Sequence, residues 1–526
     1  MHPLIQEIET VHTPESLVED LLNEVKADGV VLLRTSSFDS PPARYSFVAA
    51  RPFLTFRSFG SGCEITHHPA SATQQQFGNP WHLLDALMAR YELLDEIDLP
   101  FPLGGCFGYW GYDLKNFTEP KLPRRAVNDM ELPDCHVGFY GSLVVFDHHL
   151  GKVFIVATGL SEEASRSEKR AQEQLKFWSS LLGNNSPRRR GDAERENSGQ
   201  HPSALATQIN SNLSRDEFIS AVERAQQYIR AGDIYQVNLS QRLTAALSWQ
   251  TGTPDQLGSP HQNERMSAFR DVHPADKSFG WELFQKLCAV SPAPFSAYVH
   301  CGNFEVASSS PEQFLRMSGS HIVTRPIKGT RPRDADPTRD AQLAYEVQTS
   351  AKELAELVMI TDLLRNDLGK VCEYGSVQTP ELARLEKFAQ VQHLVSTVEG
   401  RLRKDVTHFA AFAYSFPGGS ITGAPKFRAM EIIDELEPVS RGPYCGAIGY
   451  LGFNRESQLS IAIRTAICTP ENIHFNVGAG IVADSNPAAE YEETLVKARG
   501  FLTALEKRGA RLCRRPAAVT SKHEDP

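Results

Sequence analysis

The sequence predicts an α+β fold in which helices cover large antiparallel β-sheets. Hydrophobic residues make up 41% and charged residues 22% of the 526-residue chain, as in ordinary globular proteins. Short stretches rich in β-branched and aromatic residues recur along the chain and predict strands. These stretches follow one another too often to alternate with helices as parallel βαβ units do. Antiparallel sheets are therefore favoured.

The first 160 residues consist mainly of predicted strands, at 30–34, 45–49, 54–59, 142–146 and 153–157. A turn-like segment at 147–151 separates the last two, as in a β-hairpin. Two polar stretches follow, at 183–212 and about 251–277, with too few large apolar residues to offset the entropy lost on ordering. We interpret both as linkers or surface insertions. They divide the chain into regions 1–182 and 213–508, followed by a flexible tail at 509–526.

The second region opens with the best-defined helix of the sequence. Ser214 and Glu217 form a capping-box pattern, apolar residues follow at helical spacing, and Gly232 ends the helix. A strand at 235–239 comes next. Further strands are expected at 304–308, 322–325, 447–453, 459–467 and 474–477, and further helices at about 343–365, 425–436 and 487–507. Apolar residues at alternate positions of 459–468 predict one strand with Arg464 on the face opposite the core.

Charge and cysteine content exclude several classes of protein. The net charge of −10 argues against nucleic-acid or anionic-membrane partners, which require clustered lysine and arginine. No two of the nine cysteines have CxxC spacing, so neither a disulfide framework nor a zinc site is indicated. The sequence has no signal-peptide pattern and no apolar run near the ~20 residues that span a membrane. We expect a cytoplasmic protein with reduced thiols.

Two acidic helix faces are candidates for a metal site. Glu353 and Glu356 share one face at i, i+3 spacing, and Glu490 and Glu493 share another. Together they could bind Mg²⁺, which takes a few carboxylates plus water and substrate oxygens. The alternative is a pair of solvated helix faces, which is the commoner use of such spacing.

Two glycine-rich segments, at 418–426 and 478–480, are candidates for anion binding by backbone N–H groups, with Lys426 or Arg464 supplying charge. Ordinary glycine turns are the alternative. Lys328 lies in a segment bracketed by proline and glycine, among Arg325, Arg331 and Arg333. Neighbouring cations and burial both lower the pKa of a lysine, so Lys328 is either a nucleophile or part of an exposed anion-binding loop. His393 by itself predicts a hydrogen-bonded core histidine.

Several motifs occur together and in one order: GGCFGYWGYDL (104–114), GDIYQVNLS (232–240), SSPE (309–312), PIKGTRPR (326–333), KELAE (352–356), DLLRND (362–367), GGSITGAPK (418–426), GAGIVADSNP (478–487) and EYEET (490–494). This combination resembles the chorismate-utilising enzymes, and within them component I of the aminodeoxychorismate synthases. The resemblance implies two large antiparallel sheets that form a sandwich covered by helices. It also implies an N-terminal region at 1–182 like that of anthranilate synthase component I, and a chorismate-binding catalytic region at 213–508.

The resemblance implies a Mg²⁺-dependent replacement of the 4-hydroxyl of chorismate by ammonia, leading to 4-aminobenzoate and folate. Gln236 stands where the water-adding isochorismate and salicylate synthases carry lysine, which implies ammonia as the nucleophile. Lys328 stands where anthranilate synthases typically carry alanine, which implies the 4-amino product. The alternatives are an anthranilate synthase component I of the tryptophan pathway and a catalytically silent, tryptophan-binding family member.

The resemblance also implies a role for each site residue. Lys328 would attack C2 of chorismate while Glu312 protonates the departing hydroxyl. The ring pocket would be lined by His393, Thr330 and Thr422. The residues implied to hold the substrate carboxylates are Arg464, Tyr450, Lys497, Gly478, Ala479 and Gly480, and those around Mg²⁺ are Glu353, Glu356, Glu490 and Glu493.

Two partners are implied as well. The sequence contains no glutamine amidotransferase segment, so ammonia should come from a separate glutaminase subunit. Ser36, Pro292 and Phe295 stand where related enzymes hold tryptophan, in a pocket distant from chorismate. Two ordinary loops are the alternative there.

Overall fold

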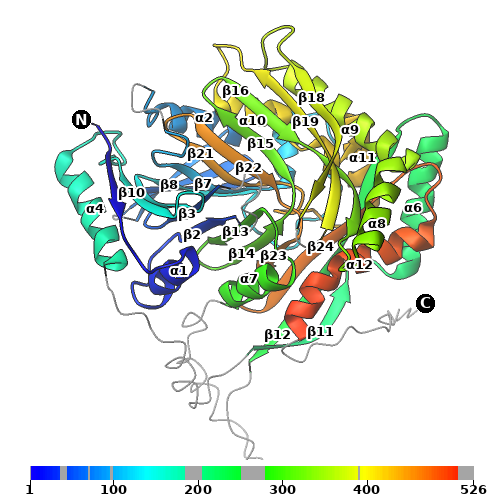
Figure 1. Ribbon diagram of the computed structural model, residues 1–526, viewed down its shortest axis with the longest axis horizontal. Coiled ribbons are helices and arrows are strands. Elements are labelled where there is room, and N and C mark those ends of the chain that lie inside the picture. The colour runs from blue at the N-terminus through cyan, green and yellow to red at the C-terminus, as the bar shows by residue number, and fades with distance from the viewer. Residues whose placement is uncertain are drawn as a thin grey trace, which may run out of the picture.

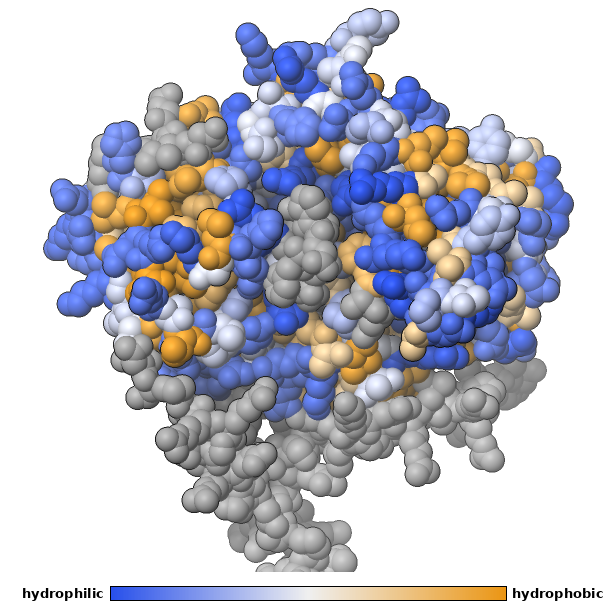
Figure 2. Space-filling model, in the orientation of Figure 1, coloured by the Kyte–Doolittle hydropathy of each residue, from blue (hydrophilic) through white to orange (hydrophobic). Residues whose placement is uncertain are grey.

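The computed structural model describes residues 2–35, 44–68, 71–94, 99–183, 204–249, 279–388 and 391–506. Two twelve-stranded sheets, in which every strand pairing is antiparallel, face each other and carry helices on their outer sides (Figure 1). The predicted α+β sandwich is confirmed. None of the helices in the described ranges is both long and apolar enough to cross a membrane. Figure 2 shows hydrophilic residues over much of the visible face, with apolar residues gathered in smaller patches.

Sheet A contains, in spatial order, β1 (Leu4–Ile8), β10 (Lys152–Ala157), β9 (Ser142–Asp147), β3 (Tyr45–Ala49), β2 (Val31–Arg34), β13 (Phe295–His300), β14 (Glu305–Ser310), β23 (Thr465–Cys468), β24 (Asn472–Ile481), β12 (Gln236–Trp249) and β11 (Ala204–Ser211). The short strand β20 (Gly423–Ala424) pairs with the start of β12. The two predicted regions share this sheet, because β2 of the first pairs with β13 of the second.

Sheet B contains, in spatial order, β17 (Ile327–Pro332), β19 (Val391–Arg401), β16 (His321–Arg325), β15 (Gln313–Ser318), β22 (Glu456–Ile461), β21 (Ala447–Gly452), β7 (Gly105–Trp110), β8 (Cys135–Tyr140), β4 (Leu54–Phe59), β5 (Gly62–His67) and β6 (Ala72–Phe77). β18 (Gln378–Lys387) also pairs with β19. The regions meet here too, where β7 pairs with β21.

The helices cover the sandwich. Those that pack on sheet A are α1 (Pro14–Asn23), α4 (Glu168–Leu182), α6 (Arg215–Arg230), α7 (Phe279–Val290), α11 (Lys426–Leu436) and α12 (Pro487–Glu506). Against β17 and β19 of sheet B pack α8 (Pro337–Thr349) and α9 (Ala351–Gly369). The remaining helical segments are α2 (Pro80–Ala89), η2 (Tyr112–Leu114), α3 (Lys115–Thr118), α10 (His408–Ser415) and η6 (Gly419–Ile421). The larger apolar core joins buried residues of both sheets with residues of α2, α6, α10 and α11, and a second core lies between sheet A and its helices.

The predicted helix after the linker is confirmed. The Ser214 side chain accepts from the Glu217 backbone N–H, and the Glu217 side chain accepts in return from the Ser214 N–H at 2.7 Å. The linker itself is shorter than expected. β11 falls within 183–212 and pairs with β12. The pairing satisfies the backbone hydrogen-bonding groups of this segment, so it forms a strand in spite of its polar composition. Residues 184–203, the insertion at 251–277 and the tail at 509–526 lie outside the described residues.

Two predicted elements divide in the structure. The helix expected at 343–365 is two helices that meet at Ser350, whose side chain caps α9 by accepting from the Glu353 N–H. Serine competes with helix-interior hydrogen bonds and favours such caps. The strand expected at 459–467 is wrong: its first half is β22 in sheet B and its second half is β23 in sheet A. Both faces of these strands are buried, so the alternation of apolar and polar residues did not distinguish a core face from a solvent-facing one.

Candidate active site between the sheets

The candidate site is a cavity of about 660 Å³ between the two sheets. β12 and β24 of sheet A line one side, β17 and β19 of sheet B line the other, and the first turns of α9 and α12 border it. The chain crosses from one sheet to the other twice at this place. Pro311 and Glu312 connect β14 to β15, and residues 462–464 connect β22 to β23. These crossings bring Glu312 and Arg464 to the cavity wall.

Most of the predicted site residues line this cavity. They are Glu312, Lys328, Thr330, Glu353, Glu356, His393, Arg464, Gly478, Gly480, Glu490, Glu493 and Lys497. Segments separated by more than 150 residues are thus brought together by the two sheets.

Four predicted residues do not line the cavity. Ala479 is buried in the core on the other face of β24 from Gly478 and Gly480, because side chains alternate along a strand. The Thr422 hydroxyl is buried and donates to the carbonyl of Gly418 at 3.1 Å. Gln236 is buried beside Gly480, and its Oε1 has no hydrogen-bond partner. The expected placement of these side chains in the cavity wall is corrected accordingly.

Tyr450 is the fourth residue placed elsewhere. Its ring packs in the apolar interior, 5.1 Å from the Phe47 ring and 5.3 Å from the Phe107 ring. Tyr444, six residues earlier, lines the cavity instead. A tyrosine therefore stands in the wall, but on the loop before β21 rather than on the strand.

The cavity wall also contains polar residues that the sequence analysis did not select, namely Asn238, Arg331, Lys352, Ser420, Tyr444 and Asn476. Strand periodicity would have found Asn476, which precedes the cavity-lining Gly478 by two residues on β24. Residues at i and i+2 share one face of a strand.

Lys328 lies on β17, where the pairing with β19 shifts register between Lys328 and Thr330. The intervening Gly329 has φ +64° and approaches Glu353 so closely that a Cβ would stand 2.5 Å from the Glu353 Oε2. Glycine is therefore required at this bulge. The side chain of Lys328 faces the cavity but is otherwise enclosed by protein.

Burial lowers the pKa of Lys328, and the carboxylates of Glu356 and Glu312 act against that effect. The expectation that three arginines contribute is wrong. The arginine side chains are paired with acids: Arg325 with Glu386, Arg331 with Glu353, and Arg333 with Asp340. Lys497 is the cation that lowers the pKa of Lys328 further. Desolvation, not a ring of positive charge, thus favours the neutral amine.

Glu312 is 7% exposed, and burial raises the pKa of its carboxyl to about 7. A hydrogen bond from Ser420 and the charge of Lys328 both oppose that rise. The backbone of Glu312 is fixed at the crossing, because its carbonyl accepts from the Ile461 N–H at 3.0 Å. A carboxyl of this pKa exchanges its proton near neutral pH, which suits a general acid.

His393 lies on β19 opposite Thr330, and its Nδ1 is 2.8 Å from the Thr330 hydroxyl. Burial, with a smaller effect of Arg464, lowers the pKa of His393 to about 4. The imidazole is therefore neutral at pH 7. It is a buried, hydrogen-bonded histidine, as its sequence context predicted, and it also stands in the cavity wall.

Arg464 stands at the crossing from β22 to β23 with φ +50°, a left-handed conformation that residues other than glycine seldom adopt. Burial lowers the pKa of its guanidinium, whose Nη1 donates to the Ser291 hydroxyl at 3.3 Å. On the opposite border, the Lys497 Nζ donates to the carbonyl of Gly478 at 2.8 Å. Two cationic side chains are thus available to anionic groups in the cavity.

The four predicted metal ligands all face the cavity, but each is engaged differently. Glu353 accepts from Arg331 at 2.9 Å, and its second oxygen is buried without a partner. Glu493 pairs with Lys497 at 2.8 Å. Glu490 accepts from the Ser485 hydroxyl at 2.6 Å, and burial raises its pKa. Burial also raises the pKa of Glu356, with smaller contributions from Glu353 and Glu493.

These carboxylates do not converge into a ready-made cage. Among the described residues, no three acidic, histidine or cysteine side chains stand close enough together to hold a metal ion. Mg²⁺ is nevertheless compatible with the donor set, since it is commonly held by one or two carboxylates together with water and substrate oxygens. The unpaired Glu353 oxygen and the carboxylates of raised pKa provide such donors. Magnesium binding stays a prediction.

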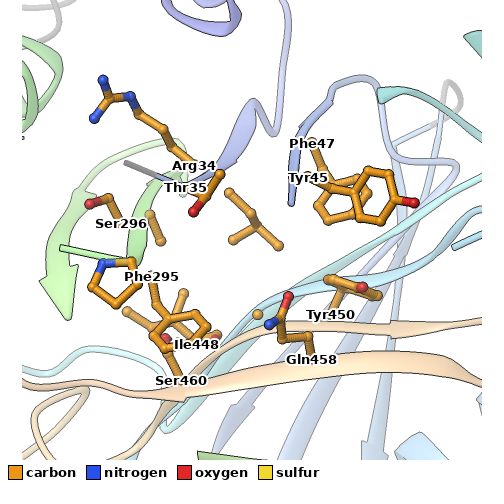
Figure 3. Close-up of a pocket in the computed structure, with 14 residues that line it drawn as sticks. Arg34, Thr35, Tyr45, Phe47, Phe295, Ser296, Ile448, Tyr450, Gln458 and Ser460 are labelled. Carbon is orange, nitrogen blue, oxygen red and sulfur yellow. Dashed lines mark hydrogen bonds between the residues drawn. The ribbon is translucent and has the colours of Figure 1, made fainter. Parts of the chain in front are cut away.

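A second cavity lies between the sheets, where β2, β3 and β13 face β21 and β22. It measures about 40 Å³, and Figure 3 shows the rings of Tyr45, Phe47 and Tyr450 at one end and Phe295 at the other. Of the three residues predicted for a tryptophan pocket, Phe295 lines this cavity. Pro292 is exposed outside it, and Ser36 lies outside the described residues. Tryptophan binding stays a prediction.

Comparisons with known proteins agree on one family. The model of the family described as chorismate binding enzyme matches residues 40–258 and 268–503. The chain is 36% identical over 469 residues to anthranilate synthase component 1 of Acetivibrio thermocellus, covering 89% of this chain and 88% of the relative. It is also 36% identical over 479 residues to aminodeoxychorismate synthase component 1 of Escherichia coli strain K12, covering 91% and 93%.

Solved structures show the same architecture. The crystal structure of anthranilate synthase component I from Streptococcus pneumoniae TIGR4 superposes with a TM-score of 0.71 at 29% identity, covering 88% of this chain and 93% of that one. MenF, the menaquinone-specific isochorismate synthase of Escherichia coli, gives a TM-score of 0.64 at 16% identity, covering 96% and 95%. The second likeness concerns the fold alone.

Proposed function

Since the chain belongs to the chorismate-binding enzyme family, we propose that it replaces the 4-hydroxyl of chorismate with ammonia to form 4-amino-4-deoxychorismate. The observation that supports this most is the placement of Lys328. Its amine faces the same cavity as Glu312, and burial lowers its pKa. A lysine nucleophile and a carboxylic acid of pKa about 7 are the pair that two successive displacements on a ring would use.

The proposed reaction begins with the neutral Lys328 amine. Its nitrogen forms a bond to C2 of chorismate, both conjugated ring double bonds shift toward C4, and the 4-hydroxyl leaves as water with a proton from Glu312. Ammonia then forms a bond at C4, the two double bonds shift back, and the bond between C2 and Lys328 breaks. The ammonium proton returns to the base left on Glu312. Nitrogen replaces oxygen at C4, and Lys328 is regenerated.

The rest of the cavity would bind and orient the substrate. Arg464 and Lys497 provide positive charge for the two carboxylates, and the neutral His393 with Thr330 provides a polar wall for the ring. Mg²⁺ held by Glu353, Glu356, Glu490 and Glu493 would supply charge that orients one carboxylate and offsets negative charge. The buried Gln236, with its unpaired Oε1, stands behind this wall as a candidate acceptor for ammonia.

The proposed reaction requires a partner that supplies ammonia. The relatives are named as component 1, which implies a second component, and we expect a separate glutaminase subunit to deliver ammonia in the cytoplasm.

The alternative product is anthranilate. Relatives of both names are equally identical to this chain. Lys328 favours the 4-amino product, because the anthranilate synthases typically carry alanine at this place in the motif.

Product identification tests the proposal. Purified chain is incubated with chorismate, Mg²⁺ and ammonium, and the products are separated and identified by mass. The expected product retains the enolpyruvyl group and yields 4-aminobenzoate after a 4-amino-4-deoxychorismate lyase is added. Fluorescence of anthranilate without added lyase would refute the assignment. A parallel reaction with K328A shows which product depends on this chain rather than on a contaminating enzyme.

A further inference from the structure

A buried ion pair stands directly behind one wall of the candidate active site. Arg441, 2% exposed, lies on the loop between α11 and β21 and pairs with Glu437, 5% exposed. The Arg441 Nε and Nη2 donate to the two Glu437 oxygens at 2.9 and 2.7 Å. Neither residue lines the cavity. The chemistry assigned above uses neither of them.

The same guanidinium joins two segments of the cavity wall. Its Nη2 donates to the carbonyl of Asn238 on β12 at 2.7 Å, and its Nη1 donates to the carbonyl of Ile421 in η6 at 3.1 Å. Glu437 adds a second bond to β12, because its Oε1 accepts from the Ser240 N–H at 2.8 Å. Asn238 and Ile421 both line the cavity. The ion pair therefore adds side-chain bonds between β12 and η6 to the backbone bond that the Asn238 N–H donates to the carbonyl of Thr422 at 2.9 Å.

Arginine is suited to this place in a way that lysine is not. Four hydrogen bonds leave the rigid fork of Arg441 in different directions, whereas a lysine ammonium places all its donors on one atom. The guanidinium also lies 4.7 Å from the ring centre of Tyr112 and 5.8 Å from that of Tyr444, another residue of the cavity wall. Its contacts are thus distributed around the site.

Stability alone does not account for such a pair. Removing two charges from water is unfavourable, and apolar replacements of buried ion pairs are often neutral or stabilising. What the pair provides is a defined geometry. The residue next to Ile421 is Ser420, which donates the hydrogen bond to Glu312. The position of η6 therefore determines whether Ser420 reaches the carboxyl.

We infer that the Arg441–Glu437 pair is a positioning element of the active site, which holds η6 against β12 and thereby keeps Ser420 on Glu312. The inference rests on the proposed function for its kinetic test but not for its binding test. The chain offers a matched control in Arg242, which is 5% exposed, lies on the same strand β12 and pairs with Asp129. Arg242 does not line the cavity.

The test is a double-mutant cycle with the full chain. R441M, S420A, the double variant and the control R242M are assayed for total chorismate consumption with ammonium and Mg²⁺, whichever amine forms. R441M is expected to lower kcat on the order of 100-fold, as displacements of about 1 Å do. S420A is expected to lower kcat roughly tenfold or more through loss of a hydrogen bond to a charged group. R242M should stay within about threefold of the wild type.

The decisive quantity is the kcat of the double variant. If Arg441 acts through Ser420, the double variant will be no slower than R441M by more than about twofold. If the losses of kcat in R441M and S420A multiply in the double variant, the inference is overturned. A folded R441M with nearly full kcat would also overturn it, as would a loss of kcat in R242M equal to that in R441M. Melting curves establish which variants fold. If R441M does not fold, R441K takes its place in the test, because it keeps the positive charge but loses the planar guanidinium. Full activity in R441K would refute the positioning role of Arg441.

A binding measurement separates this inference from the proposed function. Calorimetric titration with chorismate should show an affinity roughly tenfold weaker for R441M, because Asn238 and Tyr444 lose their support, and unchanged for R242M. If the wild type binds chorismate without converting it, the proposed reaction fails, and this comparison alone tests the positioning role. Equal affinities for R441M and the wild type would then overturn it.

Discussion

The two cavities lie between the same pair of sheets, yet their walls differ in kind. In the smaller cavity, β2, β3 and β13 face β21 and β22, and a lining of mainly aromatic and aliphatic side chains leaves only about 40 Å³. In the larger cavity, the chain itself passes between the sheets at Glu312 and Arg464. A crossing backbone keeps the sheets from closing on each other and brings polar groups into the gap. The larger cavity, which is the candidate active site, thus lies where the two layers are connected by the chain, not where they are packed.

The largest expected effect concerns the amine of the larger cavity. K328A should lower kcat for chorismate amination by roughly 10³-fold or more, because loss of a covalent nucleophile removes the proposed two-step route. The control is K152A, which removes an exposed lysine paired with Glu7 on the edge of sheet A. Exposed ion pairs contribute little, so K152A should behave as the wild type. Turnover of K328A to the 4-amino product at an undiminished rate would contradict the covalent role.

The second prediction concerns the pH dependence set by the pair of Lys328 and Glu312. Catalysis requires Lys328 without its proton and Glu312 with its proton. Burial raises the pKa of Glu312 to about 7 and lowers that of Lys328 from its ordinary value. Below pH 7, Glu312 stays protonated and kcat/KM rises as Lys328 deprotonates. Above pH 7, loss of the Glu312 proton offsets that gain, so the profile levels off.

The variant E312Q reveals this compensation. Its kcat/KM should be lower by about 10²- to 10⁴-fold, since general acid catalysis is lost, but should continue to rise above pH 7, since Lys328 still loses its proton and residue 312 no longer does. The rates are measured at a constant concentration of free ammonia, so that the ionisation of ammonium does not enter. A profile of E312Q that levels off at the same pH as that of the wild type would show that another group is responsible.

The sequence predicted local features of the site and left their assembly open. The Ser214 capping box and the paired glutamates Glu353 and Glu356 depend on residues within one turn of helix, and the structure places them as expected. The placement of Lys328 in the site followed from the motif. The cause of the lowered pKa of Lys328 could not be predicted from the motif, because its three arginine neighbours in sequence are each paired to an acid contributed by another segment.

The errors share one cause, which is that local patterns do not say which layer a residue belongs to. The alternation in 459–467 predicts one strand, although β22 and β23 belong to different sheets. Ala479, Thr422 and Tyr450 each lie within six residues of one that lines the larger cavity but present their side chains elsewhere. A single residue step reverses the face of a strand. Segments were therefore predictable, and individual orientations were not.

A third, smaller effect is expected from the acidic side of the larger cavity. E356Q should raise the Mg²⁺ concentration for half-maximal activity by roughly tenfold or more, because a glutamine supplies one neutral oxygen in place of a carboxylate. Calorimetric titration with Mg²⁺ provides a readout independent of turnover. The control is E492Q on α12, next to Glu493 in sequence but exposed and outside the cavity wall. Equal Mg²⁺ dependence of E356Q and E492Q would remove Glu356 from the metal site.

The smallest effects compare one tyrosine hydroxyl in each cavity. Y444F removes a hydroxyl from the wall of the larger cavity and should lower kcat/KM about tenfold, the usual consequence of losing a hydrogen bond to a charged substrate group. Y450F removes the hydroxyl of a ring packed against Phe47 and Phe107, and should change kcat/KM less than twofold and stability by under about 1 kcal/mol. Both are measured with chorismate and ammonium, alongside thermal unfolding. A larger catalytic loss in Y450F than in Y444F would return Tyr450 to the site and would mean that the two cavities communicate, because the two rings line different cavities.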